Sequence, residues 1–288
     1  MGNYTHQTAP TQFVQANGIR FAYRRFGKSS GLPLVFNMHF TGTMDHWDPA
    51  VTDGFANERE VILFDNAGVS SSSGEVPTSV EAMGTNAIAF TKALGLKQVD
   101  VLGISIGGLV AQEITLQAPD LVRRLVLVGT GPRSGESMDT GTPEGKQIFG
   151  ATYEYPDELW LHVHFTPSDQ SQAAGRKFLK RFRLRTKDRD SEVTEKAALA
   201  QRTAIAKWGA KHEHAWDYLK EIKQPTLVVN GSNDVIIYTI NSYILQQNLP
   251  NAQLIIYPDS AHGSLYQYPE LFVRHVSMFL SAADPWAT

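Results

Sequence analysis

The segment Val99-Asp100-Val101-Leu102-Gly103-Ile104-Ser105-Ile106-Gly107-Gly108 decides the expected fold. It begins as a short run rich in valine and leucine, typical of a buried strand, and residues 106–118 continue with apolar residues at helical spacing. Between the two, a Gly-x-Ser-x-Gly pattern places Ser105 on a tight turn with its hydroxyl group exposed at the end of the strand. The alternative is a glycine-rich turn with an incidental serine, but the strand–turn–helix context favours a nucleophile.

Strand-like and helix-like segments alternate along most of the chain. Asn17-Gly18 separates two runs of alternating polarity and predicts an N-terminal hairpin over residues 11–26. This alternation is typical of a mainly parallel sheet with helices on both faces. Further strands are expected at 34–36, 61–64, 99–102, 125–128, 226–229 and 254–257, and helices at 80–94, 106–118 and 269–281.

The alternation breaks between the two halves of the expected sheet. Residues 133–222 contain no convincing strand run, but they include helical patterns at 192–208 and 210–222. We interpret this stretch as a helical cap inserted into one α/β domain. The core domain is then made of residues 1–132 and 223–288.

Composition excludes several classes of protein. The 288 residues include 26 basic and 29 acidic side chains, so the net charge of −3 argues against a nucleic-acid binder. The absence of cysteine excludes disulfides, thiolate metal sites and a cysteine nucleophile. No apolar run approaches the roughly 18 residues of a membrane span, and the N-terminus lacks a secretory apolar region. We expect a cytoplasmic protein without a membrane partner, and interpret the basic run 176–189 as a helix with a solvated face.

A nucleophilic serine needs a general base and an acid that orients it. Asp234 follows the expected strand 226–229, and His262 follows the strand 254–257. Both loops then lie at the carboxyl edge of the sheet, where Ser105 is expected. Asp259, three residues before His262, is the rival acid, although a role in ordering its own turn is favoured.

These features together resemble the α/β-hydrolase fold over nearly the whole chain. The resemblance rests on the Ser105 turn, on Asp234 and His262, and on the loop Asp65-Asn66-Ala67-Gly68. It implies an eight-stranded, mainly parallel sheet, a helical cap and a Ser105–His262–Asp234 triad. In some members the acid follows the strand after the serine helix, but residues 129–132 contain no carboxylate here.

The oxyanion hole is where this sequence departs from the pattern of the family. The backbone N–H of Ile106, at the start of a helix, is one expected donor. The second donor is Phe40 if the chain is aligned on Trp47, or Thr41 if it is aligned on His39, and Phe40 is favoured. His39 then occupies a position where the family usually has glycine. It is expected either to bind substrate or to pack within its loop.

The cap is expected to contact the substrate through an aromatic stretch. Trp160, His162 and Phe165 are candidates for the surface over Ser105. The pairs His162/His164 and His212/His214 imitate the spacing of metal ligands, but without a convincing carboxylate or strand context no metal site is predicted.

The predicted function is hydrolysis of a small ester or lactone through an acyl-enzyme, without a cofactor. The family also includes cofactor-free haloperoxidases, which use the same triad to form peracids, and hydrolases that cleave carbon–carbon bonds. A ligand receptor on the same fold is a further alternative.

Overall fold

The structure is a computed structural model that describes residues 4–283. Its centre is an eight-stranded sheet in the order β1-β2-β4-β3-β5-β6-β7-β8. The direction of β2 is opposite to that of the other seven strands, which all run the same way, so the predicted mainly parallel sheet is confirmed. The strands are β1 (Gln12–Ala16), β2 (Ile19–Gly27), β3 (Leu34–Asn37), β4 (Glu60–Phe64), β5 (Val99–Ile104), β6 (Val122–Val128), β7 (Thr226–Gly231) and β8 (Ala252–Tyr257).

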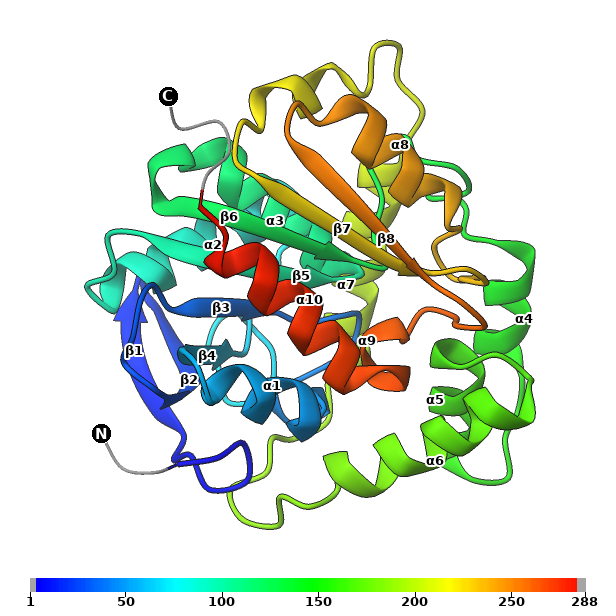
Figure 1. The fold of residues 1–288 in the computed structure, drawn as a ribbon, viewed down its shortest axis with the longest axis horizontal. Coiled ribbons are helices and arrows are strands. Elements are labelled where there is room, and N and C mark those ends of the chain that lie inside the picture. Colours follow the sequence, from blue (N-terminus) through cyan, green and yellow to red (C-terminus); the bar gives the residue numbers. More distant parts are fainter. Residues whose placement is uncertain (1–3, 284–288) are drawn as a thin grey trace.

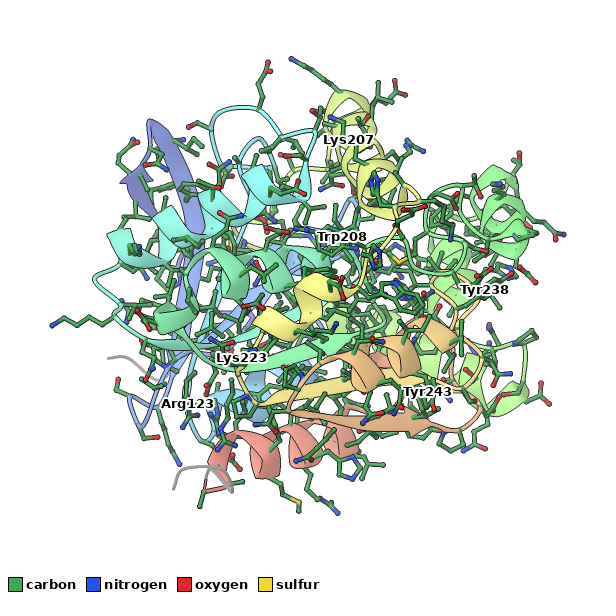
Figure 2. The ribbon with its side chains drawn as sticks, turned by 90° about the horizontal axis from the view of Figure 1, so that it is seen from above. Arg123, Lys207, Trp208, Lys223, Tyr238 and Tyr243 are labelled. Atoms are coloured by element: carbon green, nitrogen blue, oxygen red, sulfur yellow. The ribbon has the colours of Figure 1, made fainter. Side chains whose placement is uncertain are left out.

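Helices cover both faces of the sheet (Figures 1 and 2). Helices α1 (Pro49–Ala56) and α10 (Pro269–Ser281) pack on one face, and α2 (Val80–Ala93), α3 (Ile106–Gln117) and α8 (Ile240–Asn248) pack on the other. Successive buried residues of β4 point alternately into the two layers, since side chains alternate across a strand. This burial on both faces explains the short, continuous apolar runs in the sequence.

Local sequence accounts for the ends of several elements. Asn17 and Gly18 have φ of 49° and 74°, which gives the tight turn between β1 and β2 that Asn-Gly predicts. Ser79 caps α2 by accepting a hydrogen bond from the N–H of Ala82, so this helix begins at the expected residue. Three short elements complete the core: η1 (Met44–His46), η2 (Pro119–Leu121) and α9 (Ser264–Gln267).

The predicted helical insertion leaves the sheet after β6 and returns at β7. Figure 1 shows its first three helices, α4 (Pro143–Gly150), α5 (Pro156–His164) and α6 (Asp169–Phe182), beyond the sheet and beside α9. They are followed by α7 (Glu195–Gly209) and η3 (Asp217–Glu221). The helix expected over 210–222 was therefore wrong: mostly exposed turn residues precede one short 3-10 helix there. Of the described helices, none is long and apolar enough to cross a bilayer.

The insertion does not form a single layer. Helix α7 places Ala197, Ala204 and Trp208 in the same buried cluster as residues of α2 and α3. Figure 2 labels Trp208, which lies over this side of the sheet. Helix α7 is therefore part of the core packing, and we propose that only residues 133–194 act as a cap.

Buried charges attach the cap to the core. Arg181 donates two hydrogen bonds, of 2.8 and 2.6 Å, to the buried carboxylate of Asp48. Arg185 is 3% exposed and donates to three backbone carbonyls of the N-terminal segment, those of His6, Gln7 and Ala9. The basic run 176–189 forms the predicted solvated face only in part: Arg176, Lys177 and Lys180 of α6 are exposed. Arg181 and Arg185 instead satisfy a carboxylate and backbone carbonyls that folding buries.

Candidate active site

Ser105 lies on a strained turn between β5 and α3. Its φ of 57° and ψ of −126° are unusual for a residue with a side chain, and such strain is frequent at functional sites. A Cβ atom at Gly103 would lie 2.1 Å from the carbonyl oxygen of Gly107. A Cβ atom at Gly107 would lie 2.1 Å from the carbonyl oxygen of Asn37. The glycines therefore permit the close approach of strand and helix that the turn needs.

Asp234 and His262 meet in a buried hydrogen bond. The Nδ1–H of His262 donates to Oδ2 of Asp234 over 2.8 Å, and both side chains are at most 3% exposed. Oδ1 of Asp234 accepts from the backbone N–H groups of Ile236 and Ile237, at 2.9 and 3.1 Å. These bonds fix the carboxylate, and the carboxylate in turn leaves Nε2 of His262 as a proton acceptor.

The rival acid, Asp259, has a different set of partners. Its two carboxylate oxygens accept hydrogen bonds from the hydroxyl groups of Thr166 and Ser168, at 2.7 and 2.6 Å. These bonds lower the pKa of Asp259 and tie its turn to the loop between α5 and α6. The geometry therefore favours Asp234 as the acid that orients His262.

The second oxyanion donor is distinguished by a contact that the sequence does not reveal. The N–H of Thr41 donates to Oε1 of Gln201 over 2.8 Å, so this N–H is already in use. Gln201 comes from α7 and is 5% exposed. Ile106 lies at the first position of α3, where a backbone N–H has no partner within its own helix. Phe40 and Ile106 are therefore the better pair of candidate donors.

Ser105 and His262 line one cavity of about 510 Å³. Its walls come from the loop after β3, from the cap helices and from the segment that follows α6. Two of the predicted substrate contacts, His39 and Trp160, belong to this wall. The other lining residues are Phe40, Thr41, His46, Phe149, Pro156, Asp157, Leu159, Val163, His164, Phe182, Arg183, Arg189, Glu192, Val193 and Ile236.

Two other predicted contacts lie outside the cavity wall. His162 is exposed and stacks on Tyr153, with ring centroids 5.2 Å apart. Phe165 is 2% exposed and packs against Phe178 in the core. A helix turns by 100° per residue, so with Trp160 on the cavity side its neighbours there are 163 and 164 rather than 162. Helical spacing from Trp160 is thus the sequence signal that would have predicted Val163 and His164 as residues of the cavity wall.

Three histidines other than His262 lie in the wall. The rings of His39 and His164 are 5.4 Å apart, and His164 stacks on His262 with centroids 5.8 Å apart and planes inclined by 15°. His46 stacks on Trp160 at 5.0 Å. No sequence pattern predicts that His39, His46 and His164 lie close together. Within residues 4–283, no group of three or more histidine or acidic side chains is arranged to hold a metal ion.

Burial keeps these three imidazoles neutral. Desolvation lowers the pKa of His39 to about 3 and that of His46 to about 4. The pKa of His164 also lies well below its ordinary value, because of burial and then the neighbouring histidines His39 and His262. Charge on a buried imidazole is costly, so the cavity wall stays uncharged at these positions down to acidic pH.

We expect His46 to make the protein less stable as the pH falls from 7 to 5. In this range the unfolded chain binds a proton at His46, with its ordinary pKa of 6.5, whereas the folded state, with a pKa of about 4, does not. The free energy of unfolding should therefore fall by about 2 kcal/mol on account of this one residue. Urea unfolding at both pH values, for wild type and His46→Phe, measures the difference.

Wild type must be compared with His46→Phe because buried carboxylates change the free energy of unfolding in the opposite direction as the pH falls. Burial raises the pKa of Asp190 to about 6, so acidification stabilises the fold through that group. His46→Phe should leave this contribution in place and remove only its own. An equal pH dependence in wild type and variant would show that His46 accepts a proton in the folded protein.

Comparison with known proteins agrees with the observed fold. The model of a protein family described as the alpha/beta hydrolase fold matches residues 33–269. The chain belongs to the α/β-hydrolase family. A solved structure of an alpha/beta hydrolase fold protein from Chitinophaga pinensis is 42% identical to this α/β-hydrolase, with a TM-score of 0.91 over 97% of this chain and 100% of that one.

Two curated relatives of this α/β-hydrolase carry functional names. A protein of Agrobacterium fabrum named "Putative carbamate hydrolase RutD" is 26% identical over 87% of this chain and 94% of its own length. A poly(3-hydroxyalkanoate) depolymerase of Ectopseudomonas oleovorans is 30% identical over 77% of this chain and 75% of its own length. The two names describe different substrates: a carbamate for the first protein and a poly(3-hydroxyalkanoate) for the second.

Proposed function

We propose that this chain is a serine hydrolase that cleaves a small ester or lactone through an acyl-enzyme. The observation that carries the proposal is the buried hydrogen bond between Asp234 and His262, in loops beside a cavity that also contains Ser105. A serine hydroxyl is a weak nucleophile until an oriented imidazole accepts its proton. A protein that only binds a ligand does not require a serine beside an oriented imidazole.

The proposed reaction proceeds in two halves. Oγ of Ser105 attacks the acyl carbon while Nε2 of His262 takes the hydroxyl proton, and the backbone N–H groups of Phe40 and Ile106 hold the oxyanion. Collapse breaks the bond to the leaving alkoxide, which receives the proton from His262. Water then attacks the acyl-enzyme by the same route and releases the acid.

The names of the relatives support acyl chemistry of this kind. A carbamate, a polyester and a simple ester all present a carbonyl carbon to the nucleophile and expel a heteroatom. The name of the polyester depolymerase favours an oxygen leaving group. Perhydrolysis uses the same acyl-enzyme with peroxide in place of water.

The test combines turnover with covalent labelling. The purified protein is assayed on 4-nitrophenyl acetate and butanoate, and then treated with diisopropyl fluorophosphate and digested for mass spectrometry. We expect hydrolysis of both esters and a single phosphorylated serine, Ser105. Labelling of Ser105 without turnover of any ester or lactone would indicate a receptor, and turnover with Ser105 unlabelled would overturn the proposal. Adding hydrogen peroxide to the assay measures perhydrolysis.

The cap is expected to select the substrate without supplying catalytic groups. Trp160 lines the cavity, so Trp160→Ala should change the KM for a bulky ester by roughly 10- to 200-fold, whereas turnover of an acetyl ester survives. Phe165→Ala is the matched control, because Phe165 lies in the core below the same helix. It should lower the free energy of unfolding by about 3–5 kcal/mol and leave acyl selectivity unchanged. The kinetic comparison uses a short and a bulky ester with each variant.

A further inference from the structure

The peptide unit between Phe40 and Thr41 is held at both of its polar ends. Its carbonyl oxygen lies 2.9 Å from Nδ1 of His39, which therefore carries a proton, and it accepts a second hydrogen bond of 2.8 Å from the hydroxyl group of Thr41. Its N–H donates to Oε1 of Gln201 over 2.8 Å. Phe40 is also the residue with the candidate oxyanion donor, so the orientation of this peptide bears directly on the site.

The turn that contains this peptide is of a type that does not suit threonine. The N–H of Gly42 donates to the carbonyl of His39 over 3.1 Å, and of the two central residues only Thr41 has a positive φ, of 54°. This is the pattern of a type II turn, which favours glycine or asparagine at that position, whereas a type I turn has negative φ at both positions. The two types differ by reversal of the central peptide. A β-branched residue disfavours positive φ, so side-chain contacts must hold the observed orientation.

Gln201 interrupts the buried face of α7. Residues 197, 201, 204 and 208 follow one another at helical spacing, and Ala197, Ala204 and Trp208 lie in the same apolar cluster. Gln201 occupies the remaining position of this face and is 5% exposed. Burying an amide side chain is unfavourable unless it forms hydrogen bonds, and its Oε1 accepts from Thr41. A polar residue in this place therefore indicates a role for that one bond.

Gln201 acts on the site from behind the loop. In the described part of the chain, Phe40 and Thr41 line the cavity that contains Ser105, and Gln201 does not. Gln201 instead lines a separate cavity of about 10 Å³ together with Ile106, which has room for about one water molecule and none for a substrate. Within residues 4–283 the N–H of Phe40 has no acceptor, as a donor reserved for an oxyanion requires.

We propose that Gln201 is a positioning residue for the oxyanion hole: it holds the Phe40–Thr41 peptide in the type II orientation and thereby keeps the N–H of Phe40 in place as a donor. In the reversed peptide, the carbonyl of Phe40 would lose its contacts with His39 and with the hydroxyl of Thr41, so Phe40 would no longer be anchored on its carboxyl side. The inference rests on the proposed ester hydrolysis. It assigns to α7, outside the proposed cap, an effect on rate rather than on substrate selection.

The first experiment compares kcat and KM for 4-nitrophenyl butanoate. Gln201→Met keeps the length of the side chain and removes the acceptor, so kcat should fall by roughly 10- to 100-fold, as expected for a donor displaced by about 1 Å, with KM within about 3-fold. Gln201→Glu retains an acceptor oxygen and should recover most of kcat. Ala204→Gly weakens the same helix without removing a hydrogen bond and should keep kcat within about 3-fold. Wild-type kcat in folded Gln201→Met, or an equal loss in Ala204→Gly, would overturn the inference.

A second substitution tests whether Gln201 acts through the turn. Glycine adopts positive φ without strain, so a Thr41→Gly turn should keep the type II form without help from Gln201. In the Thr41→Gly background, Gln201→Met should therefore lower kcat by less than about 3-fold. The same loss in both backgrounds would show that the two residues act independently and would contradict the proposed coupling.

Two measurements that need no ester turnover separate this inference from the proposed reaction. Amide hydrogen exchange at Thr41, followed by NMR, should be about 10-fold or more faster in Gln201→Met than in wild type. Phosphorylation of Ser105 by diisopropyl fluorophosphate should be slower by roughly 10-fold or more, because the phosphoryl oxygen uses the same donors. Unchanged exchange or unchanged labelling contradicts the inference even if no ester is hydrolysed. A wild type in which Ser105 is neither labelled nor active contradicts the proposed function itself, and faster exchange at Thr41 then still supports the effect of Gln201 on the turn.

Discussion

Ser105→Ala is expected to reduce kcat for ester hydrolysis by on the order of 10⁴-fold or more, with the fold unchanged. The substitution removes only the nucleophilic oxygen. The backbone of the turn, including the N–H of Ile106, stays in place because it is held by Ser105 N–H donating to the carbonyl of Val128, and by Thr130 Oγ1 donating to the carbonyl of Ser105. Any residual rate then comes from binding and from the oxyanion donors alone.

The measurement is steady-state turnover of 4-nitrophenyl butanoate by wild type and variant, with thermal unfolding as the control for folding. Ser105 has a φ of 57°, and alanine at this position has the same backbone constraint as serine, so a similar unfolding temperature is expected. A variant that keeps more than about a tenth of wild-type turnover would exclude Ser105 as the nucleophile.

Asp234→Asn is expected to reduce kcat by roughly 10³- to 10⁴-fold. The amide oxygen of asparagine replaces Oδ1 and still accepts from the N–H groups of Ile236 and Ile237. This places the amide NH₂ opposite Nδ1 of His262, where in the wild type a carboxylate oxygen accepts a hydrogen bond from Nδ1–H over 2.8 Å. The imidazole is then driven to the tautomer with its proton on Nε2, which cannot take the proton of Ser105.

Asp259→Asn is the matched control for this prediction. Asp259 bonds to Thr166 and Ser168 rather than to His262, so its loss should affect the stability of the turn far more than kcat. Turnover within about 10-fold of wild type is expected. If Asp259→Asn were the more damaging of the two substitutions, the acid would have to be reassigned to Asp259.

Much of the fold was predictable because it is encoded locally. Strands buried on both faces appear as short apolar runs, and Asn17-Gly18 and Ser79 mark element ends through their own backbone and side-chain chemistry. The family match and the parallel sheet confirm the predicted fold. The helix expected over 210–222 was wrong because its residues are mostly exposed and provide no continuous apolar face to pack.

The sequence by itself determined the three candidate catalytic positions. Ser105, Asp234 and His262 each follow a recognisable strand, and the carboxyl ends of parallel strands meet at one edge of the sheet, so their proximity follows from topology alone. Only the tertiary structure decided which acid faces His262. Asp234 and Asp259 both leave strand ends, and the hydrogen bonds of Thr166 and Ser168 to Asp259 depend on how the cap docks.

The tertiary structure also decided the chemistry of the cavity wall. His39 and His164 are distant in the chain, and their rings approach to 5.4 Å only because α5 packs over the loop after β3. The same holds for Gln201, which reaches Thr41 from α7. Sequence patterns report the period of an element and the face that it buries, whereas the pairing of side chains from an insertion and a sheet depends on the angle and depth at which they pack.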